Sequence, residues 1–332
     1  MATMRELSRW IRDYGHDPRH QHRLIANTRV WYQLWTAMDI IDDVDSAMDA
    51  YLDNEFPAEI GERYLRLYGA MQGLFLQQDA LADLIKVIHP AKEVLRNDVL
   101  KDVRDARNAS VGHPTQLRRN GELSTHGIVQ NSMTKNGFSL LSYPAPERNL
   151  LQYVPVLEMI RNQRAEAVRI LEEVINELRE QDKAHKAKFR NSKLVSVFDQ
   201  AGYAFEKIFE ESRPNAVRVL GRWAIDHLQT CLDNFARLLK ERGAGIEAYD
   251  SIEYRYNEIA HPLAELRKFL FRESSEVLSD KSAVVFAEAL QSHFDTLRHI
   301  AGEIDDEYAS APSPIGRPEL SNVPNVVTTG EK

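Results

Sequence analysis

The chain has 332 residues, of which 43% are hydrophobic and 28% charged, so it is long enough for two folded domains. Its net charge of −8 disfavours a general nucleic-acid binder, although a local basic groove remains compatible with it. The single cysteine, Cys231, excludes an internal disulfide and a multi-cysteine metal site. We find no secretory signal and no apolar stretch near the roughly 18 residues that indicate a membrane span, and we therefore expect a cytoplasmic protein without a membrane segment.

Helical periodicity dominates the first third of the chain. Apolar residues recur there every three or four positions, which predicts amphipathic helices. With only 15 glycines and 13 prolines, the composition also argues against a strand-and-turn architecture. The predicted helices cover residues 5–15, 20–53, 61–89 and 95–107.

Residues 119–148 differ in character from the rest of the chain. Residues 128–133 and 138–143 are each typical of a short strand, and Asn136-Gly137 between them suits a tight turn. Pro144 and Pro146 end the second strand. We therefore predict one β-hairpin, which joins the two halves of the chain.

The second half returns to helical periodicity. The predicted helices cover residues 156–182, 191–211 and 214–239, a shorter segment around 254–262, and a last helix that starts near residues 279–282. From residue 309 onward, prolines alternate with small polar residues, which predicts a disordered tail. The expected fold is all-α, with an N-terminal bundle (1–118), the hairpin linker (119–148), a C-terminal bundle (149–308) and the tail (309–332).

One predicted helix ends in a segment that carries both an arginine and a histidine. Residues 104–115 read Arg-Asp-Ala-Arg-Asn-Ala-Ser-Val-Gly-His-Pro-Thr. Gly112 is a natural helix stop, because a residue without a Cβ adopts the left-handed conformation easily. Pro114 cannot continue a helix and disfavours helical geometry at His113. We therefore expect Arg107 on the last turn and His113 just past it.

A second segment repeats the spacing. Residues 254–262 read Tyr-Arg-Tyr-Asn-Glu-Ile-Ala-His-Pro, so that Arg255 and His261 are again separated by five residues and a proline again follows the histidine. We expect this segment, like the first, to close a helical bundle.

Two Arg-x5-His segments on helical domains resemble the HEPN superfamily, whose ribonuclease members carry an Arg-x(4–6)-His motif on a small helical bundle. The first segment is the better match, because Asn108 directly follows Arg107. In the second, Tyr256 separates Arg255 from Asn257. The resemblance implies a ribonuclease that needs no metal or other cofactor. It implies catalytic roles for Arg107, Asn108 and His113, and for Arg255, Asn257 and His261 as a second set.

The residue types suit that chemistry. Histidine moves protons near neutral pH, and a forked guanidinium stabilises negative charge on a phosphate. Positions six apart on a helix differ by about 240° in azimuth, so Arg107 and His113 can cooperate only if the helix ends between them. Gly112 and Pro114 provide that ending.

RNA is therefore the expected partner. Three further arginines lie in or beside the first motif, where phosphate contacts would position a substrate. They are Arg104, Arg118 and Arg119. HEPN sites typically combine two motifs across a dimer, so the resemblance implies either a homodimer or an internal pseudo-dimer in which both motifs of one chain converge.

A non-catalytic interpretation stays open beside this one. An arginine and an asparagine at a helix C-terminus complement the helix dipole and bond to the last carbonyl groups. The alternative function is a helical binding or dimerisation module that retains the motif as architecture.

Overall fold

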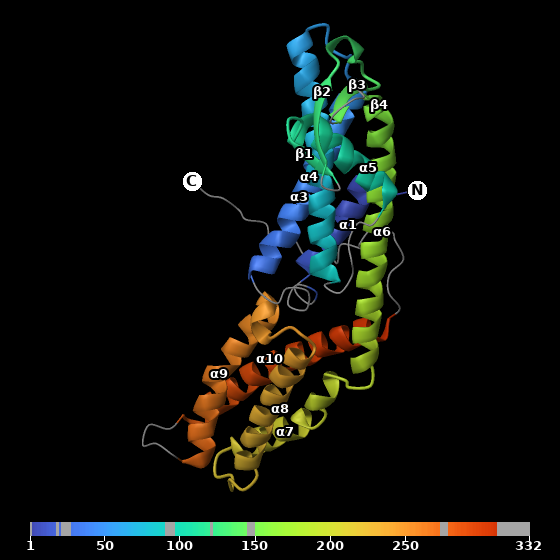
Figure 1. Ribbon diagram of the computed structural model, residues 1–332. Helices are drawn as coiled ribbons and strands as arrows, with labels where there is room; N and C mark the ends of the chain where they lie inside the picture. The colour runs from blue at the N-terminus through green and yellow to red at the C-terminus, as the bar shows by residue number, and fades with distance from the viewer. Residues whose placement is uncertain are drawn as a thin grey trace, which may run out of the picture.

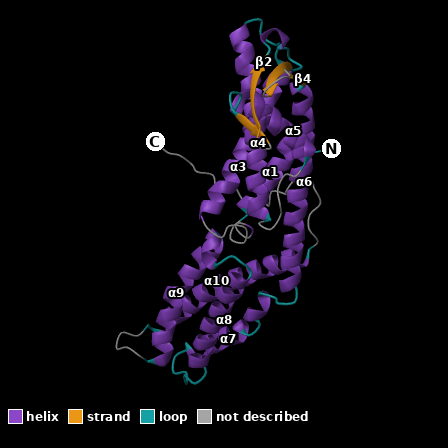
Figure 2. Ribbon diagram, viewed as in Figure 1, coloured by secondary structure: helices purple, strands orange, loops and turns teal. Residues whose placement is uncertain are grey.

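The computed structural model describes residues 2–17, 20, 28–89, 97–119, 122–144, 150–272 and 278–310 of the chain (Figure 1). Helices predominate, and one small sheet lies at one end of the elongated molecule (Figure 2). The N-terminal group of helices consists of α1 (Met4–His16), α3 (Thr28–Asp53), α4 (Ile60–Ile88) and α5 (Asp98–Arg107). The long α6 (Val156–Phe189) leads from this group to α7 (Ala201–Glu211), α8 (Gly221–Glu241), α9 (Asp250–Phe271) and α10 (Asp280–Ala309).

Side chains cap the N-terminal ends of α1, α4, α5 and α10. Thr3 and Glu6 form a reciprocal capping box at the start of α1, and Ser279 accepts a hydrogen bond from the backbone N–H of Ser282 at the start of α10. Such caps satisfy backbone donors that have no partner within the helix. The cap predicted near residues 279–282 is thus confirmed.

The β structure is larger than the predicted hairpin. Four antiparallel strands lie in the order β1-β2-β3-β4. Their bounds are Leu117–Arg119, Glu122–Ile128, Phe138–Pro144 and Leu150–Val154. The second predicted strand corresponds to β3, whereas the first, at residues 128–133, is wrong, because β2 ends at Ile128.

Side-chain hydrogen bonds explain why the predicted first strand is a turn. Ser132 donates from its hydroxyl to the carbonyl of Val129 at 2.6 Å and accepts from the backbone N–H of Ser139 at 2.7 Å. Such local bonds compete with strand pairing. The tight turn is confirmed one residue earlier than predicted, since Thr134 and Gly137 exchange backbone hydrogen bonds around it.

The hydrophobic clusters assign most of α6 to the N-terminal group of helices. Leu171, Ile175 and Leu178 of α6 pack with α1, α3 and α4, and Ile160 packs with residues of the sheet. The sheet therefore belongs to the N-terminal group of helices. The third cluster lies within α7 to α10 and the segment that precedes α7. The predicted domain scheme instead assigned residues 149–308 to the C-terminal bundle and used 119–148 as a linker.

Helix bounds in the C-terminal group differ from the prediction at several places. The segment 191–211 contains a 3₁₀ turn, Val195–Phe198, ahead of α7, and the helix predicted to start at residue 214 begins at Gly221. The last helix extends to Ala309. Most of the predicted disordered tail, residues 311–332, lies outside the described residues.

Gly137→Ala is expected to lower the free energy of unfolding by about 1–3 kcal/mol, the usual cost of a strained backbone. Gly137 has φ 155°, and an added Cβ would overlap the carbonyl oxygen of Val154 on β4. Urea unfolding followed by circular dichroism measures the change. Gly127→Ala on β2 is the matched control, because no atom lies within 4 Å of its added Cβ. Equal losses in both variants would contradict the prediction.

Candidate functional site

The first Arg/His motif lies at the C-terminal end of α5, beside the sheet (Figure 1). α5 ends at Arg107, the chain continues through a π-helical turn at Asn108–Gly112, and His113 has left helical geometry with φ −138° and ψ 49°. The backbone N–H of His113 donates to the carbonyl of Asn108 at 2.8 Å. The predicted location of His113, just past the helical segment, is confirmed.

Contacts with α4 and with its own turn hold the guanidinium of Arg107. Nε and Nη2 donate to Oε1 of Gln72 at 3.1 and 2.9 Å, and Nη1 donates to Oδ1 of Asn108 at 3.0 Å. The guanidinium carbon lies 4.1 Å from the ring centroid of Phe75, a cation–π contact. The guanidinium therefore has a defined position and orientation.

Gly112 matters for a reason other than the predicted one. Among the described residues, the glycines with positive φ are Gly137 and Gly243, so Gly112 is not left-handed. The guanidinium of Arg107 lies instead against its Cα, and an added Cβ would lie 3.0 Å from the guanidinium carbon and closer still to Nη1. Because Gly112 has no side chain, the guanidinium of Arg107 can lie directly against it, one residue before His113.

The side chain of His113 is exposed. It makes no hydrogen bond or ion pair with the residues that the structure describes. Its imidazole is thus available to a molecule that approaches the end of the turn.

The three additional arginines have different environments. Arg104 forms an ion pair with Asp79 at 2.5 Å, donates to Gln78 at 3.2 Å and stacks over the same ring as Arg107, that of Phe75. Arg118 and Arg119 belong to β1, and their side chains lie outside the described part of the chain. A role for all three in substrate binding stays a prediction.

The second motif does not end a helix. α9 continues through His261 and Pro262 to Phe271, so the predicted helix end at this position is wrong. Arg255 and His261 therefore lie about 9 Å apart along the axis of one continuous helix. Packing of α9 against its neighbours outweighs the local cost of Pro262, which is buried.

The side chains of the second motif are not arranged as those of the first. Nη1 of Arg255 lies 3.4 Å from Nδ1 of His293 on α10. The ring of His261 packs edge-on against Phe286, also on α10, with centroids 5.6 Å apart, and Asn257 is exposed. The second motif thus lacks both the helix end and the Arg–Asn hydrogen bond.

The two motifs do not meet within the chain. Arg107 contacts α4 beside the sheet, whereas Arg255 and His261 face α10 in the other group of helices (Figure 1). The structure therefore brings together Arg107, Asn108 and the backbone of His113, but it does not form the internal pseudo-dimer.

A cavity of about 550 Å³ opens beside the first motif, between α5 with its π turn and the sheet. Polar side chains converge on it from both sides. The helical side supplies Asp102, Asp105 and Asn108, and the sheet supplies Ser124, His126, Ser142 and Gln152. Of the predicted site residues, Asn108 is the one that lines this cavity.

His126 lies between two serines on the inner face of the sheet. Its Nδ1 is 2.7 Å from the hydroxyl of Ser142, and its Nε2 is 2.9 Å from that of Ser124. Burial lowers the pKa of His126, which favours the neutral ring at pH 7. Sequence reasoning missed this group because it placed the strand after residue 128, although the Ser-x-His alternation at 124–126 was a usable signal.

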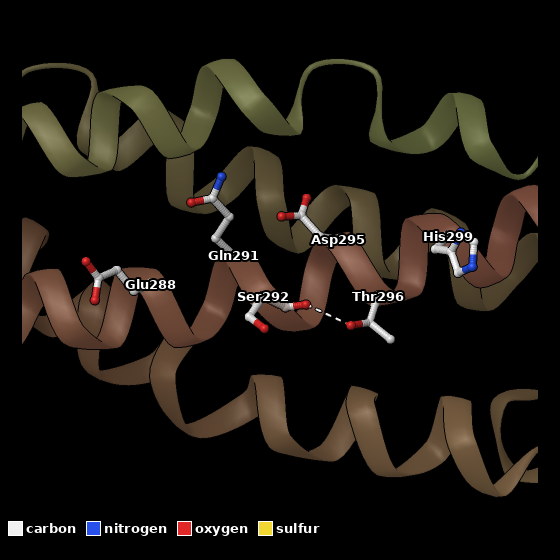
Figure 3. Close-up of a pocket in the computed structure, with 6 residues that line it drawn as sticks. All are labelled: Glu288, Gln291, Ser292, Asp295, Thr296 and His299. Carbon is white, nitrogen blue, oxygen red and sulfur yellow. Dashed lines mark hydrogen bonds between the residues drawn. The ribbon is translucent and has the colours of Figure 1, made fainter. Parts of the chain in front are cut away.

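A second hollow, of about 540 Å³, runs along the exposed face of α10 (Figure 3). Its lining residues, which include Glu288, Asp295 and His299, all come from that helix. Thr296 donates its hydroxyl hydrogen bond to the carbonyl of Ser292 at 2.9 Å, within the helix itself. Because every described residue that lines it belongs to α10, we interpret this surface as a solvated helix face.

Within the described residues, no group of three histidine, cysteine, aspartate or glutamate side chains is placed to hold a metal ion. In the same part of the chain, no helix combines the length and apolar character that a membrane crossing requires. Comparison of the chain with protein-family models, with curated protein sequences and with solved structures gave no match.

Proposed function

We propose that this protein is a metal-independent endoribonuclease whose active site is the first Arg/His motif. One observation carries the proposal: the guanidinium of Arg107 lies against Gly112, the residue that precedes the exposed His113. The cation thus lies one residue along the chain from the proposed proton-transfer group. The motif itself resembles that of HEPN ribonucleases.

The chemistry follows from these two groups. A ribose 2′-oxygen attacks the adjacent phosphorus while the bond to the 5′-oxygen breaks, which leaves a 2′,3′-cyclic phosphate and a 5′-hydroxyl. His113 takes the proton of the 2′-hydroxyl, and the leaving oxygen receives a proton from the resulting imidazolium or from water. Arg107 stabilises the negative charge that develops on the phosphate oxygens.

Arg107 has donors to spare for this role. A guanidinium carries five N–H groups, and the hydrogen bonds to Gln72 and Asn108 account for three of them. The remaining N–H groups can bind a phosphate oxygen while the others keep the side chain in place. Preorganised donors of this kind need no rearrangement when charge develops.

The test is cleavage of a mixed RNA substrate in the presence of EDTA. We expect products with 2′,3′-cyclic phosphate ends, and a rate about 10²–10³-fold lower in Arg107→Ala. Arg107→Lys, which keeps the charge but loses the fork, should recover only part of the rate. Circular dichroism shows whether each variant is folded. Undiminished cleavage by folded Arg107→Ala would refute the proposal.

We further expect that, if the active site combines two motifs, they come from two chains. The two motifs of one chain lie in different helix groups and do not meet. Light scattering after size-exclusion chromatography measures the mass. A purely monomeric and active protein would show that one motif is sufficient.

The contacts of Arg107 with Gln72, Asn108 and Phe75 also favour the second candidate function, a non-catalytic binding or dimerisation module. In that case Arg107 stabilises the end of α5 and its turn. Arg107→Ala would then lower the stability of a protein whose wild type leaves RNA intact in EDTA.

A further inference from the structure

The cavity between α5 and the sheet starts at the proposed catalytic residues. Asn108 lines it and also accepts the hydrogen bond from Arg107. A phosphate bound at Arg107 would therefore have an adjacent nucleotide at the mouth of the cavity. A volume of about 550 Å³ lies within the usual range for small-molecule sites and exceeds that of one nucleobase.

The described lining of the cavity is suited to a base. Leu140, Val154 and Met159 supply an apolar surface on which a flat ring can pack. The described residues that line it include the carboxylates of Asp102 and Asp105 but neither lysine nor arginine. The carboxylate of Asp102 makes no ion pair with the described residues, so it favours a ligand that presents N–H donors.

Guanine fits this lining better than the other bases. Its Watson–Crick edge presents N1–H and the N2 amino group side by side, which a single carboxylate can accept together. Its O6 and N7 are acceptors, to which the amides of Asn108 and Gln152 can donate. Adenine and cytosine present one amino group on that edge, and uracil presents one N–H.

Asp102 is the carboxylate best placed for the N1–H and N2 donors. It lines the cavity from α5 and forms no ion pair with the described residues. On the opposite wall, Ser142, His126 and Ser124 are joined by hydrogen bonds. This wall is rigid and offers hydrogen-bonding groups to the rest of the base.

We propose that this cavity binds a guanine base of the RNA substrate next to the cleaved phosphate, with Asp102 and Gln152 as the residues that determine specificity. The inference rests on the proposed ribonuclease function, whose substrate preference it specifies. It predicts cleavage at one fixed position relative to guanine.

Binding can be measured without cleavage in the His113→Ala background. The probes are dye-labelled hexauridylate and the same oligonucleotide with one central guanine or one central adenine, followed by fluorescence anisotropy. We expect the guanine-containing probe to bind about tenfold or more tightly than the other two. Adding Asp102→Asn should abolish that preference, and Gln152→Leu should weaken it.

Asp98→Asn is the matched control for Asp102→Asn. Asp98 is an exposed carboxylate one turn earlier on α5 and does not line the cavity. Asp98→Asn removes the same charge as Asp102→Asn. It should therefore change the binding of all three probes equally and keep the guanine preference. Loss of the preference in the control, or its persistence in Asp102→Asn, would overturn the assignment.

Two further arms separate the possible failures. Free guanosine monophosphate should compete only weakly, and competition as strong as that of the oligonucleotide would make the cavity a nucleotide site rather than a site for RNA. Guanine-selective binding by a wild type that leaves RNA intact would refute the ribonuclease alone. Cleavage without preference for guanine would refute the base site alone.

Discussion

His113→Ala is expected to lower the rate of RNA cleavage by about 10²–10⁴-fold, the usual contribution of a positioned acid or base. The equivalent change in the second motif, His261→Ala, should leave the rate unchanged. The reason is geometric: His113 lies past a helix end and next in the chain to Gly112, against which the guanidinium of Arg107 lies, whereas His261 lies within α9 and packs against Phe286. Initial rates with a fluorogenic RNA substrate in EDTA measure both.

The two histidine variants control for each other, because both side chains are exposed and both substitutions remove one imidazole. Thermal unfolding should be similar for the two, so a difference in rate reports chemistry rather than folding. Equal loss of activity in both variants would show that the second motif participates, and would contradict the asymmetry that the structure indicates.

Asp305→Ala is expected to lower the free energy of unfolding by about 3–5 kcal/mol, the usual cost of breaking a buried ion pair by removing one partner. Asp305, near the end of α10, accepts hydrogen bonds from the backbone N–H groups of Leu194 and Val195, both at 2.9 Å. It also pairs with Arg242 at 3.3 Å. One carboxylate thus joins α10, the segment after α6 and the end of α8.

Arg242 explains the size of this effect. The residue is 3% exposed, and burial lowers the pKa of its guanidinium. Its Nε and Nη1 have no hydrogen-bond partner among the described residues, while Nη2 also donates to the carbonyl of Ser192. Without Asp305, a buried positive charge would remain with that carbonyl as its one described acceptor.

Guanidinium chloride unfolding of the full chain tests this prediction. Asp306→Ala is the matched control, because Asp306 is the next residue on α10 and is exposed. Its substitution should change the free energy of unfolding by no more than about 0.5 kcal/mol. A loss of similar size in both variants would show that helix propensity, rather than the buried pair, is being measured.

Local patterns predicted the helices well where one apolar face repeats over many turns. α1, α3, α4, α6 and α10 all follow such a repeat, and their predicted positions agree with the structure within the described residues, except that α6 continues past its predicted end at residue 182 to Phe189. The departure from helical geometry at His113 was also predictable, because Pro114 disfavours that geometry at the residue before it. These are effects over a few residues, which a sequence displays directly.

Predictions failed where contacts between distant segments outweigh local preference. Pro262 lies inside α9, although a proline usually ends a helix, because the residues around it are buried in the C-terminal cluster. Residues 128–133 have strand-forming composition, yet the hydroxyl of Ser132 holds them in a turn. The strand that pairs with β3 on this side was instead the preceding polar segment, β2.

The sequence by itself determined that the chain is mainly helical and that Arg107, Asn108 and His113 lie around a helix end, because periodicity and the effect of Pro114 on His113 are local. Only the tertiary structure decided what surrounds them. Gln72 and Phe75 on α4 orient Arg107, and β2 and β3 bring His126 and Ser142 to the cavity. Such neighbours are set by the packing of whole helices and strands. No repeat or spacing in the sequence indicates which distant residues will meet.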